Sequence, residues 1–89
     1  MDDPADIYQA ILDELDHQRV LYPEDFDKRN TLNDWVTYIC RYATKATTID
    51  ANFEDQEDSL IKAAALCFAA LMTGAMHGWA PRHYDDYEN

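Results

Sequence analysis

Hydrophobic residues recur at helical spacing in the first part of the chain. Ile7 is followed by apolar residues four, five and eight positions later, which places them on one side of a helix. Asp3 and Pro4 suit the start of that helix, because Asp caps the free amides and Pro fits the first helical position. Tyr22-Pro23 should end it, since the residue before a proline avoids helical geometry. The pattern predicts a helix over residues 4–20.

The second segment has the most regular amphipathic pattern. Thr31 can cap a helix together with Asp34 three residues later, which is the arrangement of a capping box. Apolar residues then recur at i, i+3, i+4, i+7, i+8 and i+11, while Thr, Arg and Lys occupy the opposite side. We predict a helix over residues 31–46. Its apolar stripe consists of Leu32, Trp35, Val36, Ile39, Cys40 and Ala43.

The third segment is the most apolar and should be the central helix. After Lys62 no Asp, Glu, Lys or Arg occurs until Arg82. A helix on the surface of a small soluble protein keeps a charged stripe, so this one needs cover on most sides. Asn52 can cap a helix over residues 53–76, although Asp58 or Ser59 could start a shorter one. Glycines near residue 78 suit its end. The tail, 77–89, is aromatic and acidic, and we expect Trp79 to pack back on the helices.

These patterns predict a small all-α fold. Eighty-nine residues form one domain, 1–89, built as a three-helix bundle, or a four-helix one if the tail adds a helix. The small residues of the third segment allow neighbouring helices to approach closely. Three short helices can hardly cover its bulky residues on every side. We therefore expect a homodimer that shares a bundle core.

The charge of the chain restricts its partners. Eighteen acidic and seven basic residues give a net charge of −11, so direct binding to nucleic acid is disfavoured. A basic protein partner, a bound cation or simple solubility are all compatible with it. The acidic N-terminus does not resemble a signal peptide, and the Ala, Thr, Gly and His content of the third segment argues against a membrane span. We expect a cytoplasmic protein, in which Cys40 and Cys67 are small buried hydrophobic residues.

The sequence contains no evident catalytic motif. Glu54, Asp55, Glu57 and Asp58 could together hold a divalent cation, but acids in an opening helical turn also suit the helix dipole without any metal. His17 with Asp13, or His77 with His83, are weak candidates for a ligand pair. No zinc-type spacing, phosphate loop or nucleophile with a base is present. We assign no catalytic residue, no metal ligand and no cofactor from the residues.

The order of three segments resembles the small phage- and bacteria-encoded MazG-like proteins of the all-α nucleoside triphosphate pyrophosphohydrolase group. The segments are IYQAILDELDHQR, NTLNDWVTYICRYATKA and EDSLIKAAALCFAALM, and the similarity touches residues 5–76. Trp35 and the LIKAAAL stretch carry most of it. The resemblance implies an all-α fold and hydrolysis of nucleoside triphosphates to monophosphate and pyrophosphate with Mg²⁺. It also implies magnesium ligands in an E-E-x-x-E group on one helix and an E-x-x-D group on the next.

The chain departs from that family at the ligand positions. Counted from Trp35, the first acidic group falls on Arg41, Tyr42 and Lys45. Glu54 or Glu57 could supply the Glu of the second group, but no matching E-x-x-D follows. Cations at the ligand positions repel a metal ion. If the resemblance is homology, it implies a scaffold that kept the bundle and lost catalysis.

We therefore expect a non-enzymatic acidic interaction protein. The favoured hypothesis is a phage-type inhibitor that binds a basic groove of a nucleic-acid-binding host or defence protein in a bacterial cytoplasm, as DNA mimics and anti-CRISPR proteins do. The alternatives are a MazG-like pyrophosphohydrolase or nucleotide-binding relative, which would use Mg²⁺, and a plain assembly subunit. The candidate partner-binding residues are Asp13, Glu14, Asp16, Glu24, Asp25, Asp27, Glu54, Asp55, Glu57 and Asp58.

Overall fold

A computed structural model of the protein describes residues 3–21, 29–48 and 52–80. Within these ranges the chain forms three helices: α1 (Pro4–Leu21), α3 (Leu32–Lys45) and α4 (Phe53–His77). The all-α fold is therefore confirmed, and the helix bounds agree with the predicted ones to within one residue. The described part of the chain contains no strand; Thr31 and Ala80 form a single isolated bridge.

The helix ends form where the predicted caps lie. The Asp3 carboxylate accepts a hydrogen bond from the Ala5 amide at 2.9 Å. Thr31 and Asp34 form a complete capping box, and the Asn52 side chain accepts from the Asp55 amide. Gly78 ends α4 with φ at 73°, a left-handed value that favours glycine. Each cap satisfies amides or carbonyls that the helix itself leaves unpaired.

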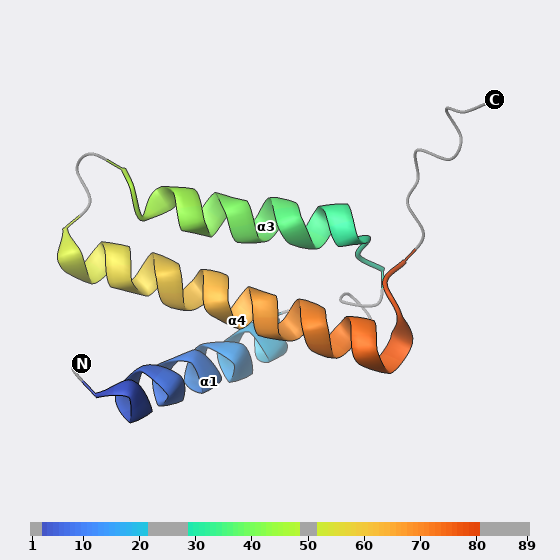
Figure 1. Ribbon diagram of the computed structural model, residues 1–89, viewed down its shortest axis with the longest axis horizontal. Coiled ribbons are helices and arrows are strands. Elements are labelled where there is room, and N and C mark those ends of the chain that lie inside the picture. Colours follow the sequence, from blue (N-terminus) through green and yellow to red (C-terminus); the bar gives the residue numbers. More distant parts are fainter. Residues whose placement is uncertain (1–2, 22–28, 49–51, 81–89) are drawn as a thin grey trace.

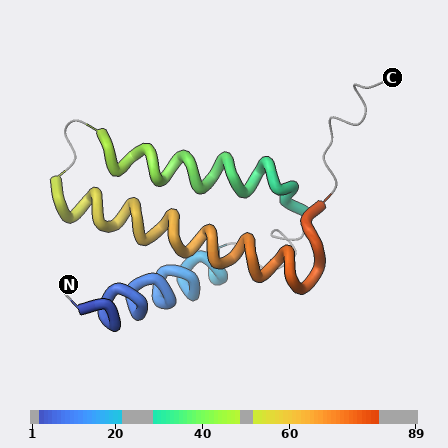
Figure 2. Tube along the Cα trace, in the orientation of Figure 1, coloured from blue at the N-terminus to red at the C-terminus, as the bar shows by residue number. Residues whose placement is uncertain are grey.

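Helix α4 lies between the other two, which pack on either side of it (Figure 1). Figure 2 shows that α1 and α4 run in the same direction while α3 runs in the opposite one. Both N-termini, of α1 and of α4, consequently lie at one end of the molecule. The central position of the apolar third helix is confirmed.

Small residues of α4 form most of the buried interior. Ala63, Ala65, Ala69 and Ala70 are buried, and their short side chains let α1 and α3 approach closely. Trp35 of α3 is the one large side chain that is fully buried in the described residues, at 2% exposure. It packs on Ala69 and Ala70, with Leu15 and Leu66 partly buried beside it.

The segment after α4 folds back toward the start of α3. The Trp79 indole nitrogen donates to the Ala70 carbonyl oxygen at 2.9 Å, and the Ala80 amide donates to the Asn30 carbonyl oxygen at 3.1 Å. Gly74 makes this possible, because a Cβ at that position would lie 2.5 Å from two carbons of the indole ring. The expected packing of Trp79 is confirmed, although the residue remains 42% exposed.

Two packing expectations are wrong for a single chain. The apolar stripe of α3 does not face the interior as a unit: Trp35 is buried, but Leu32, Val36, Cys40 and Ala43 are exposed. Cys40 and Cys67 are free and exposed rather than buried. The reason is that α4 contacts α3 along the edge of the stripe, on the side that carries Trp35, and leaves the rest of the stripe open.

Candidate functional site

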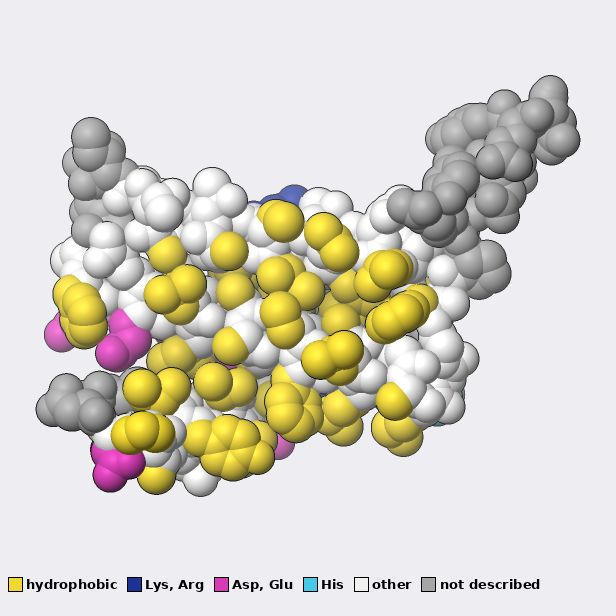
Figure 3. Space-filling view, in the orientation of Figure 1, with side chains coloured by type: hydrophobic (Ala, Val, Ile, Leu, Met, Phe, Trp, Pro, Cys, Tyr) yellow, Lys and Arg dark blue, Asp and Glu magenta, His cyan; other side chains and the backbone are white. Residues whose placement is uncertain are grey.

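A large apolar surface covers the outer sides of α3 and α4. We call the apolar face the exposed residues Leu32 and Val36 of α3 together with Phe53, Leu60, Phe68, Leu71 and Met72 of α4. Phe53 is 73% exposed and Leu71 is 68% exposed. Figure 3 shows one side of the molecule on which hydrophobic side chains form a nearly continuous cover.

The size of the apolar face exceeds that of an ordinary monomer surface patch. With roughly 200 Å² for a fully exposed large side chain, its seven members expose on the order of 700 Å². The largest apolar patch on a typical monomer is about 300–600 Å², whereas each partner in a standard protein interface buries about 800 Å². The apolar face therefore has the area of an interface.

Charged residues are kept away from most of this surface, and Glu57, which lines a pocket together with Phe53 and Leu60, lies at its N-terminal end. After Lys62 the described part of α4 carries no Asp, Glu, Lys or Arg. The few charged side chains visible on this side lie at its edges (Figure 3). This segregation is what an interface core requires, because burying an unpaired charge between two proteins is costly.

The first group of predicted partner-binding residues lies on α1 and is split by the fold. Asp13 and Asp16 are exposed and point away from α4, on the same outer side as Asp6. Glu14 lies at the inner edge of the helix and is only half-exposed. It accepts a hydrogen bond from the Gln18 amide nitrogen at 3.1 Å. The outer acidic face of α1 thus consists of Asp6, Asp13 and Asp16.

The second predicted group lies in the opening turns of α4. Glu54, Asp55 and Asp58 are exposed, and Glu57 is half-buried beside the N-terminal half of α1. Because α1 and α4 are parallel, Asp3 and Asp6 lie at the same end of the molecule as these acids (Figure 1). The structure therefore concentrates negative charge at one end. Glu24, Asp25, Asp27 and His83 lie outside the described residues.

Lys62 lies where carboxylates from two helices converge. Its ammonium group forms an ion pair with Asp58 at 3.1 Å and lies 5.9 Å from the centre of the Tyr42 ring. The hydrogen bond that Lys62 donates to Asp58 raises the pKa of Lys62, and the negative charges of Asp58 and Glu14 act in the same direction against the opposing effect of burial. The lysine ammonium group balances part of the charge of these carboxylates.

The described residues contain no group of three His, Cys, Asp or Glu side chains that could hold a metal ion. The positions at which the resemblance implies acidic residues are occupied by cationic and aromatic ones, namely Arg41, Tyr42 and Lys45. Lys45 stacks over the Tyr42 ring at 5.1 Å, and Arg41 is exposed on α3. Within the described chain, this arrangement does not fit the magnesium site of a pyrophosphohydrolase.

One cavity was not expected from the sequence. It lies between α1 and α3, over the side of α4 that carries Leu66 and Ala69, and it has a volume of about 250 Å³. Tyr38 and Tyr42 of α3 line it opposite Gln18 of α1. Each tyrosine is 20 or more positions from Gln18 in the sequence, and no motif links them. The i, i+4 spacing of the two tyrosines was the one available signal, and it predicts only a shared side of a helix.

By length and composition, α4 is apolar enough to cross a membrane. Its most apolar window of 18 residues has a mean hydropathy of 1.7, and 28% of that window is buried in the structure. A central helix of a soluble protein satisfies the same criteria, so this property alone places the protein in neither setting. The low buried fraction of this window shows that the other described helices leave one side of α4 exposed.

Comparison with known proteins returned no relative. No family model matches the chain, no curated protein matches it, and no solved structure matches its fold. The resemblance to MazG-like proteins therefore stays a prediction.

Proposed function

We propose that this chain is a non-enzymatic interaction protein that forms a homodimer through the apolar face and binds a basic partner through its acidic surface. The segregation of charge from the apolar face carries the proposal. A second copy is the occupant that fits best, because the face has the area that one partner of a stable dimer buries. Its aromatic and aliphatic members are also the residues that dominate interface cores.

The small number of buried hydrophobic residues in the single chain also favours dimerisation. The buried hydrophobic residues in the described chain are Trp35 and four alanines. Small domains with so little buried apolar surface are marginally stable and often depend on association. Pairing two apolar faces would bury Leu60, Phe68 and Leu71, and would also cover the exposed Cys40 and Cys67.

The proposed partner is the basic groove of a nucleic-acid-binding protein, in a bacterial cytoplasm if the chain is phage-encoded. Dimerisation through the apolar face leaves Asp6, Asp13 and Asp16 on the outside of each α1. A dimer then carries twice the charge of −11 per chain, which steers it toward cationic surfaces and away from nucleic acid. Lys62 among the carboxylates gives no support to the alternative of a magnesium-dependent pyrophosphohydrolase.

Light scattering coupled to size-exclusion chromatography tests the dimer. The wild-type chain should elute with twice the mass of 10.3 kDa, and Leu71→Glu should elute as a monomer because it buries a charge in the apolar face. His17→Glu is the matched control, since it adds a carboxylate at an exposed position of α1 away from that face. A wild-type monomer at every concentration, or flotation of the wild type with lipid vesicles, would contradict the proposed dimer.

The basic partner requires a separate test with a different readout. Tagged wild-type protein should retain a basic nucleic-acid-binding protein from bacterial lysate at low salt, and free DNA should compete for the retained protein. Replacing Asp6, Asp13 and Asp16 by Asn should reduce retention without changing the dimer. The same number of neutral substitutions at Glu54, Asp55 and Asp58 shows which acidic patch binds. Retention that neither salt nor either set of substitutions alters would count against a charge-driven partner.

The two interactions should respond to salt in opposite directions. Added NaCl screens the repulsion between two chains of like charge, so it should strengthen the dimer. The same salt screens attraction to a basic partner and should weaken that complex. Sedimentation velocity over a salt series separates the two effects, and weakening of both complexes together would be inconsistent with an apolar dimer interface.

A further inference from the structure

The cavity between α1 and α3 lies on roughly the opposite side of α4 from the apolar face. Leu66 and Ala69 form its floor, and at 3.6 residues per turn they point away from Leu71. The cavity is therefore independent of the proposed dimer interface. A second copy bound to the apolar face would leave it accessible.

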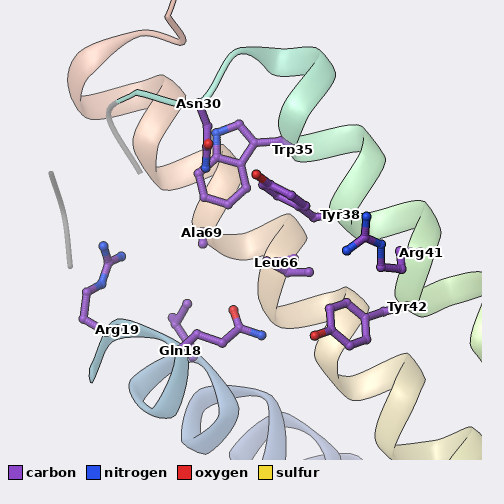
Figure 4. Close-up of a pocket in the computed structure, with 10 residues that line it drawn as sticks. Gln18, Arg19, Asn30, Trp35, Tyr38, Arg41, Tyr42, Leu66 and Ala69 are labelled. Carbon is purple, nitrogen blue, oxygen red and sulfur yellow. The ribbon is translucent and has the colours of Figure 1, made fainter. Parts of the chain in front are cut away.

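The walls of the cavity carry aromatic rings and a buried hydrogen-bond acceptor. Figure 4 shows the Tyr42 hydroxyl group directed toward α1, the Tyr38 hydroxyl group directed toward Trp35, and the Gln18 amide oxygen directed from α1 into the intervening space. The nitrogen of that amide already donates to Glu14 at 3.1 Å. The oxygen is buried and accepts no hydrogen bond from the described residues. An unpaired buried acceptor costs free energy, and a donor on a bound molecule would remove that cost.

The rim of the cavity is basic although the chain is strongly acidic. Arg19 of α1 and Arg41 of α3 line it from opposite sides (Figure 4), and no described Asp or Glu does. Two of the seven basic residues thus face one cavity in a chain of net charge −11. A guanidinium group pairs well with a planar carboxylate through two parallel hydrogen bonds. The net charge of the chain favours a monoanion over a doubly charged phosphate.

The volume limits the size of the ligand. An engineered cavity of about 150 Å³ holds benzene, so about 250 Å³ holds a single ring with two small substituents, on the order of ten non-hydrogen atoms. We infer that this cavity binds a single-ring aromatic carboxylate with a hydrogen-bond donor on the ring. The ring lies against Tyr38 and Tyr42, the donor contacts the Gln18 oxygen, and the carboxylate reaches Arg41. This site goes beyond the proposed function and does not depend on it.

Nuclear magnetic resonance titration of the full chain with 4-hydroxybenzoate tests the site. The amide signals of residues around the cavity and the indole signal of Trp35 should shift and saturate, while the signals of Leu60 and Leu71 on the apolar face should not. 4-Methoxybenzoate lacks the donor and 4-hydroxybenzyl alcohol lacks the anion. Each should bind about tenfold more weakly, since one such hydrogen bond is worth about 1.4 kcal/mol.

Variants locate the contacts. Arg41→Gln should remove the preference for 4-hydroxybenzoate over 4-hydroxybenzyl alcohol, and Arg29→Gln is the control because it neutralises an exposed base that does not line the cavity. Gln18→Met should remove the preference over 4-methoxybenzoate and leave the fold intact, since Gln18 is only half-buried. Absence of saturable shifts with 4-hydroxybenzoate up to its solubility limit would overturn the inference. So would shifts that persist unchanged in both Arg41→Gln and Gln18→Met.

Discussion

The two sides of α4 present opposite surfaces although both belong to one apolar helix. On one side, Ala63, Ala65, Ala69 and Ala70 are buried against α1 and α3, and Trp35 packs on them. On the other side, bulky residues such as Leu60 and Leu71 are exposed. The interior of the single chain therefore uses the small residues of the helix, and the large ones remain exposed. The difference shows that hydrophobicity alone does not identify the buried side of α4, on which the buried residues are the small ones.

Substitution of Trp35 should have the largest effect on the buried side. Trp35→Ala removes the one fully buried large side chain of the described residues, and such changes cost about 3–5 kcal/mol. Much of the stability of a domain this small would be lost. Chemical denaturation monitored by circular dichroism measures the change. A loss below about 1 kcal/mol would show that the buried side is not the folding core.

A substitution of Gly74 tests the packing of the Trp79 indole ring against α4. Glycine to alanine in a helix ordinarily stabilises by up to about 1 kcal/mol, but here the added Cβ would collide with the indole ring. We expect Gly74→Ala to destabilise by about 1–3 kcal/mol. In a Trp79→Ala background the same change should become stabilising. A double-mutant cycle measures this reversal of sign, and equal effects in both backgrounds would be inconsistent with the contact.

Dilution of the protein should weaken contacts made by the exposed side of α4 without weakening those of its buried side. If the apolar face is a dimer interface, the melting temperature of the wild type rises with protein concentration. Leu71→Ser should abolish that dependence while lowering the stability of the monomer by no more than about 0.5 kcal/mol, because Leu71 is 68% exposed in the single chain. Differential scanning calorimetry over a concentration series measures both quantities. A Leu71→Ser protein that still depends on concentration would place the interface elsewhere.

The smallest expected effect concerns Lys62, which belongs to neither side. Its ion pair with Asp58 is largely solvated, so Lys62→Met should cost less than about 1 kcal/mol at neutral pH. The pKa of Lys62 is raised above its ordinary value of 10.5, so the pair contributes fully below that pH. Its contribution is lost as the pH rises through the raised pKa. Comparing the unfolding free energies of wild type and variant across this range checks the sign; a difference that grows with pH would contradict it.

The sequence alone determined the helices and where they end. Asp3, Thr31, Asn52 and Gly78 act through local hydrogen bonds or backbone geometry, which depend only on neighbouring residues. The spacing of apolar residues determined that each segment has a hydrophobic side. The lack of charge after Lys62 determined that the third helix is central. A helix without a charged stripe needs neighbours on more than one side to cover its apolar surface.

Only the tertiary structure decided which part of each apolar stripe is buried. The stripe of α3 reads as one surface in the sequence, but α4 contacts its Trp35 edge and leaves Leu32 and Val36 exposed. The tertiary structure likewise decided that Tyr38, Tyr42 and Gln18 line one cavity, and that the negative charge of Glu14 acts on Lys62 together with that of Asp58. The physical reason is that helical periodicity fixes directions around one axis. The relative positions of two axes depend on close packing of small residues such as Ala69 and Ala70, which a hydrophobic pattern does not encode.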